Sequence, residues 1–123
     1  MITSGIFSTS RRVFPGQNLV LRSSLSLYTA RNEVISCQVL LQDHGASVDT
    51  RCSLSIESLG TATSIQVRIR RVGFVPVPQY NTDTPLSELD RGGNLLGFVP
   101  DALLDENEIE LSPGASGMFW ITL

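Results

Sequence analysis

The side chains best able to do chemistry in this sequence are carboxylates near its C-terminal end. Five of them lie within ten residues: Asp101, Asp105, Glu106, Glu108 and Glu110. Two carboxylates held about 5 to 9 Å apart can hydrolyse a glycosidic bond. Spacing along the chain does not give that separation. The run DENEIE (105–110) is typical of a solvated loop, with a weak calcium site as the alternative.

The other residues of catalytic type are too few to build a familiar site. His44 is the only histidine and lies in a turn-like stretch, so a catalytic triad or a two-histidine metal site is hard to build, and an exposed turn residue is the favoured interpretation. The two cysteines, Cys37 and Cys52, have no neighbouring histidines and do not make a zinc motif. A glycine-rich phosphate loop and a Gly-x-Ser-x-Gly elbow are also missing. The sequence therefore predicts that this chain alone is not an enzyme and uses no cofactor or metal.

Charge argues against nucleic acid and anionic membranes as partners. The formal net charge is −3, and all nine cationic residues are arginine. Only 17% of the residues are charged, against about 25% in typical domains, which indicates that a second domain or a partner covers part of the surface. No apolar run reaches the roughly 18 residues of a membrane span, and the N-terminus does not read as a signal peptide.

The hydrophobic residues alternate with a period of two, which predicts β-strands. The runs that do so are 18–30, 33–43, 51–59, 64–77 and, on both sides of a Pro113-Gly114 turn, 108–123. Within 33–43 the residues expected to face the core are Ile35, Cys37, Val39 and Leu41. Those expected to face solvent are Ser36, Gln38 and Gln42. Turn signals about every ten residues predict an all-β, antiparallel sandwich of immunoglobulin or jelly-roll type.

A long connection from about residue 76 to residue 100 interrupts this pattern. Its stretch TPLSELDRG (84–92) predicts a short helix, with Thr84 as N-cap and Gly92 as the stop. The apolar stretch GFVPDALL (97–104) closes the connection. We expect it to fold back as a plug of the core, with Leu103 buried and Asp101 holding the turn after Pro100.

The stretch QDHGAS predicts a hairpin between the second and third runs. With His44-Gly45 at its tip, Cys37 faces Cys52 across the two strands. Directly opposed cysteines can form a strained disulfide. The alternative is a pair of buried free thiols that behave as small hydrophobic side chains.

Several stretches, in order, resemble one known family. They are YTARNEVISCQVLLQ (28–42), IRRVGFVPV (69–77), and GFVPDALL (97–104) followed by LSPGASGMFWITL (111–123). Together they resemble the N-terminal β-sandwich domain of family 123 glycoside hydrolases and related bacterial proteins. The matching positions are Glu33 and Gln38 in the first stretch, Phe74 in the second, and Pro100, Asp101, Leu103 and Trp120 in the last.

The resemblance implies that residues 1–123 are one β-sandwich domain, excised from the N-terminal part of a longer, secreted or cell-envelope protein. In that family a following (β/α)-barrel carries the catalytic carboxylates, so no catalytic residue is carried over to this chain. The implied role is a non-catalytic accessory domain whose partner is that barrel. The residues expected to serve its structure are Glu33, Cys37, Cys52, Pro100, Asp101 and Leu103. A shortened sandwich also predicts an open strand edge, through which two copies could form a homodimer.

A carbohydrate-binding module is the alternative function. Such modules need exposed aromatic rings that pack on the faces of sugars. The rings that could do so here are Phe74, Tyr80, Phe98 and Trp120.

Overall fold

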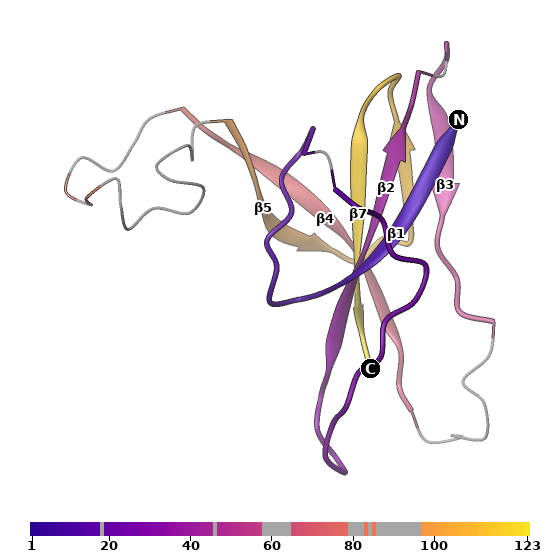
Figure 1. Cartoon of the computed structure of the whole chain (residues 1–123), viewed down its shortest axis with the longest axis vertical. Helices are drawn as coiled ribbons and strands as arrows, with labels where there is room; N and C mark the ends of the chain where they lie inside the picture. Colours follow the sequence, from indigo (N-terminus) through magenta and orange to yellow (C-terminus); the bar gives the residue numbers. More distant parts are fainter. Residues whose placement is uncertain (18, 46, 58–64, 79–82, 84, 86–96) are drawn as a thin grey trace.

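The computed structural model describes residues 1–17, 19–45, 47–57, 65–78, 83, 85 and 97–123, and every regular element in these ranges is a strand. The strands are β1 (Ile2–Ser8), β2 (Ser36–Asp43), β3 (Thr50–Ser53), β4 (Arg68–Val77), β5 (Gly97–Leu104), β6 (Glu108–Leu111) and β7 (Ser116–Thr122). The all-β, antiparallel class is confirmed (Figure 1). Within the described ranges, no helix is long and apolar enough to cross a membrane.

The strands form two antiparallel sheets. The larger has five strands in the order β1-β2-β7-β4-β5, and the smaller pairs β3 with β6. The last strand of the chain, β7, lies at the centre of the large sheet, where Phe119 is opposite Val39 of β2 and Arg71 of β4. Because β7 has a strand on each side and cover on each face, Phe119 is fully buried.

One face of the large sheet carries the main core. Its buried members are Phe7, Val13, Leu40, Val72 and Met118, with Leu19, Leu21, Phe74 and Trp120 packed against them. The irregular segments 9–17 and 19–27 after β1 cover this face, because three of these side chains come from them. Gln42 of β2 helps to hold the segment, since its Nε2 donates to the Gln17 carbonyl at 3.0 Å.

The small sheet covers the opposite face. Two side chains of β6, Ile109 and Leu111, pack directly over Gly117 of β7, where a Cβ would come within 2.7 Å of Leu111 Cδ2 and still closer to Ile109. Glycine is therefore needed here so that the two sheets can approach. Phe119 and Ile121 follow Gly117 on the same face of β7, and both are buried.

The predicted hairpin between the second and third runs is wrong. Strand β2 pairs with β1 on one side and with β7 on the other, so neither edge is left for β3. Strand β3 pairs instead with β6, in the other sheet, where Cys52 lies opposite Ile109. Cys37 lies opposite Ile121, and both cysteines are free thiols.

Two further strand predictions differ from the structure. Residues 19–30 form no strand, because this segment packs across β1 through its side chains, with Leu21 against Gly5 and one backbone bond from Ile6 to the Arg22 carbonyl. The exposed face predicted for 33–43 is also wrong. Both faces of β2 are covered, so Gln38 is as buried as Cys37, at 3% exposure each. The alternation of side chains did not predict strand β1.

The stretch GFVPDALL is not a core plug. It is the edge strand β5, paired with β4 along its length, and the Leu103 side chain is 38% exposed. Asp101 lies within this strand and holds no turn. The predicted helix over 84–92 falls, apart from Pro85, outside the described residues.

Candidate functional site

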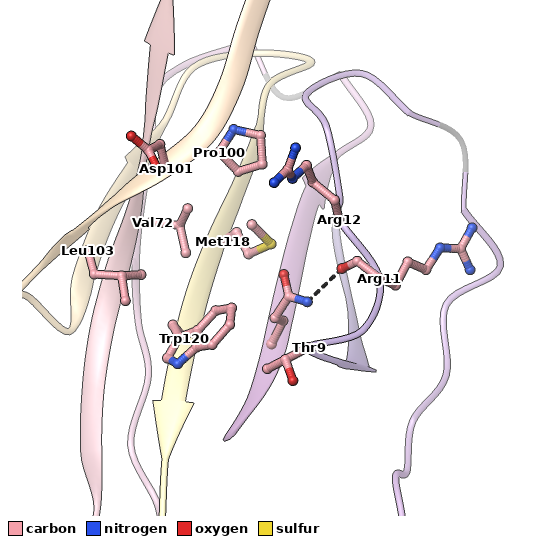
Figure 2. A pocket seen from close by; sticks show the side chains of 10 residues that line it. Thr9, Arg11, Arg12, Val72, Pro100, Asp101, Leu103, Met118 and Trp120 are labelled. Carbon is pink, nitrogen blue, oxygen red and sulfur yellow. Dashed lines mark hydrogen bonds between the residues drawn. The ribbon is translucent and has the colours of Figure 1, made fainter. Parts of the chain in front are cut away.

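A cavity of about 260 Å³ opens on the main-core face of the large sheet (Figure 2). Three parts of the chain enclose it: the loop after β1, the edge strand β5, and the central strands β2, β7 and β4. Its lining residues are Thr9, Arg11, Arg12, Gln38, Val72, Pro100, Asp101, Leu103, Met118 and Trp120. The cavity is slightly smaller than the ~300 Å³ at which small-molecule sites usually begin.

The floor of the cavity is apolar. Met118 and Trp120 are alternate residues of β7 and so lie on the same face, next to Val72 of β4. Met118 and Val72 are buried, whereas the Trp120 ring is only partly buried. The indole is therefore the part of the floor that a ligand can reach.

The loop after β1 forms one wall, and Gln38 holds it in place. The Gln38 Nε2 donates to the Ser8 carbonyl at 2.9 Å and to the Arg11 carbonyl at 2.7 Å (Figure 2). Because both partners are hydrogen-bond acceptors, the side-chain nitrogen of Gln38 must face the loop. Its Oε1 is then the atom with which Gln38 can accept a hydrogen bond from another group. The guanidinium of Arg11 lies over the Phe7 ring, 5.8 Å from its centroid, and its side chain points away from the cavity, whereas that of Arg12 points across it towards Pro100.

Strand β5 forms the opposite wall, with the help of a β-bulge. Val72 pairs with Leu103, but Phe74 pairs with Pro100, so β5 has one more residue than β4 over this stretch. The extra residue breaks the alternation of side chains and lets Pro100, Asp101 and Leu103 all line the same cavity. Asp101 is exposed at the rim of this wall, and its carboxylate points away from Arg12 (Figure 2).

The clustered carboxylates near the C-terminus do not converge on the cavity. Only Asp101 lines it. Asp105 binds Arg68 through two oxygens at 2.7 and 2.6 Å, and this hydrogen bonding lowers the pKa of the Asp105 carboxyl. Glu106 binds Arg71 Nε at 2.6 Å. Among the described residues, no group of three or more histidine, cysteine or acidic side chains is arranged to hold a metal ion.

Glu33 lies in a turn rather than at a site. Its Oε2 accepts from the Ala30 amide at 2.8 Å and from the Thr29 hydroxyl at 3.0 Å, and Asn32 in the same turn has a φ of 64°. The Ala30 hydrogen bond, and then the one from Thr29, lowers the pKa of the Glu33 carboxyl. This residue closes the tight turn that leads towards β2.

Three of the four aromatic residues that the sequence singled out are described by the structure, and they lie in different surroundings. Trp120 lines the cavity, Phe74 packs against the core, and Phe98 on β5 is 59% exposed. Tyr80 lies outside the described residues. The loop residues Thr9, Arg11 and Arg12 were not predicted, because nothing in the sequence indicated that this loop returns to the centre of the sheet.

Comparison of the chain with models of protein families and with curated proteins gives no match.

Proposed function

We propose that this chain is a non-catalytic accessory β-sandwich domain of a larger, secreted, glycoside-hydrolase-like protein, in which it supports a catalytic barrel. The packing of β6 on β7 through Gly117 supports the sandwich part of this proposal. The observation that carries the accessory role is an exposed apolar stripe on the edge strand β5.

The stripe consists of Phe98, Pro100 and Leu103. The first two are alternate residues, and the bulge brings Leu103 to the same face as Pro100. Phe98 is 59% and Leu103 38% exposed, so both side chains present large apolar surface to solvent. Contiguous exposed apolar surface on a domain is typical of a contact with another domain or protein.

The parent protein provides the test. The mass of the native gene product, detected with an antibody to this domain, should be several times 13.4 kDa. In that product, Phe98→Ser and Leu103→Ser should lower the thermal midpoint of the barrel. Val48→Ser, at a valine that is 68% exposed elsewhere, is the matched control and should not. A native product of the size of this chain would contradict the accessory role.

The homodimer through an open strand edge remains a prediction. Strand β5 is an edge of the large sheet, but Pro100 lacks an amide donor and the bulge at Asp101 interrupts a regular ladder. These two features disfavour pairing of β5 with a second copy. Light scattering of the purified chain tests the prediction.

Carbohydrate binding is the second candidate function, and the position of Trp120 favours it. The ring is reachable in a cavity whose walls carry charged and amide groups, instead of being enclosed in the core. The two functions give opposite expectations for the parent protein. A docked barrel would cover the β5 wall and protect a Leu103→Cys thiol from alkylation, whereas a binding module would leave it reactive.

A further inference from the structure

We infer that the cavity between the loop after β1 and strand β5 binds one pyranose ring, with Trp120 as the surface on which the ring packs. This inference rests on the second candidate function, carbohydrate binding. It adds the place of binding, the class of sugar and the residues that recognise it.

The apolar half of the cavity fits one face of a sugar. The axial C–H groups of a pyranose form an apolar face, which packs on an aromatic ring. Trp120 supplies that ring, and Met118 and Val72 beside it are buried and keep water from the floor. Pro100 and Leu103 form the opposite wall, and the cavity volume of about 260 Å³ suits a single ring.

The polar half supplies both donors and acceptors. Arg12 points across the cavity and can only donate, whereas Gln38 has committed its Nε2 to the loop and can offer only an acceptor at Oε1. A sugar hydroxyl donates and accepts at once, so neighbouring hydroxyls satisfy both kinds of group. A purely apolar ligand would displace water from Gln38 Oε1 without replacing its hydrogen bond, which costs free energy.

The protein carries a built-in reporter for the test. Trp120 is the only tryptophan, so fluorescence excited at wavelengths that tyrosine does not absorb reports on this cavity. We would titrate the chain with methyl glycosides of glucose, galactose, mannose and N-acetylglucosamine. The expected result is a saturable change in tryptophan fluorescence with at least one of these glycosides.

Substitutions then locate the site. Arg12→Gln should weaken binding about tenfold, which corresponds to about 1.4 kcal/mol. Arg31→Gln, at an exposed arginine outside the cavity, is the control and should leave affinity unchanged. Amide spectra by NMR verify the fold of each variant and follow Trp120→Phe, which lacks the reporter and should bind at least tenfold more weakly.

Each alternative result overturns the inference in a distinguishable way. Glycoside binding that shifts amides far from β7 and ignores Arg12→Gln would keep carbohydrate binding but move it elsewhere. No response to any glycoside, by fluorescence or by NMR, would remove both the inference and the second candidate function, and leave the accessory role.

Discussion

Gln38 and Trp120 lie directly opposite each other on β2 and β7, on the face of the sheet that carries the cavity. The first holds the loop that forms one wall, and the second forms the reachable part of the floor. Their positions follow from one strand register, so a slip of one residue between β2 and β7 would turn one of them to the other face. The cavity is therefore a property of the sheet and not of the loop alone.

The first prediction concerns the anchor of the loop. Gln38→Met keeps the size of the side chain but removes the Gln38 donor from the Arg11 carbonyl and from the Ser8 carbonyl, which keeps only the Arg11 amide at 3.3 Å. We expect a loss of about 1 kcal/mol in the free energy of unfolding, the usual net contribution of a hydrogen bond. Urea denaturation measures it, with Gln66→Met at an exposed position as control. Equal effects of the two substitutions would contradict the anchoring role.

The second prediction concerns the contact between the two sheets. Gly117→Ala would place a methyl group against Ile109 and Leu111, and should destabilise the fold by about 1 to 3 kcal/mol. Ile109→Val removes the nearest methyl group, so the double variant should lose less than the sum of the two single variants. Thermal or urea unfolding of all three gives the answer. Strict additivity would indicate that β6 does not pack on Gly117.

The third prediction concerns pH. The Ala30 amide and the Thr29 hydroxyl stabilise the charged form of Glu33 and lower its pKa in the folded state. The contribution of this turn is therefore present above the unfolded pKa and is lost as the pH falls through the lower, folded pKa. NMR titration of the Glu33 carboxyl measures that pKa. Thr29→Val should raise it only in part, because the Ala30 hydrogen bond remains.

A pKa of the Glu33 carboxyl at or above its ordinary value would contradict the role of these two hydrogen bonds in the turn.

The fourth prediction concerns the thiols. Cys37 is 3% exposed and burial raises the pKa of its thiol, so little reactive thiolate forms at neutral pH. Cys52 lies partly exposed on the small sheet. Iodoacetamide should therefore modify Cys52 first and Cys37 only after denaturant is added, as read by peptide mass spectrometry. A native chain lacking both free thiols would mean that the two sheets can rearrange to join them.

Alternation of side chains was sufficient to predict the strands that lie in the middle of the sheet. The runs around Val39, Ile69 and Phe119 became β2, β4 and β7 near their expected places. Alternation gave the wrong prediction for residues that are buried for a reason other than their place on one face of a strand. The leucines of 19–30 alternate like a strand but pack as a cover across β1, and Gln38 is polar yet buried because a loop carbonyl needs its amide.

The cavity was only partly predictable, since its walls come from distant parts of the chain. Trp120 and Asp101 stood out by residue type, but the loop with Arg12 lies about 90 residues before them and carries no local signal of return. The bulge that places Asp101 beside Pro100 depends on the pairing of β5 with β4. Such pairing is not encoded in either strand alone.

The sequence by itself determined the structural class, because a side-chain period of two and frequent turn residues are local properties that only β-structure satisfies. It also located the tight turn at Pro113-Gly114, where the Ala115 amide donates to the Ser112 carbonyl at 2.9 Å. Only the tertiary structure decided which strands are neighbours, which face of β2 is covered, and that Cys37 and Cys52 belong to different sheets. The reason is physical: a strand edge offers the same amide and carbonyl groups to every partner, so the choice among partners is made by the burial of side chains from the whole chain at once.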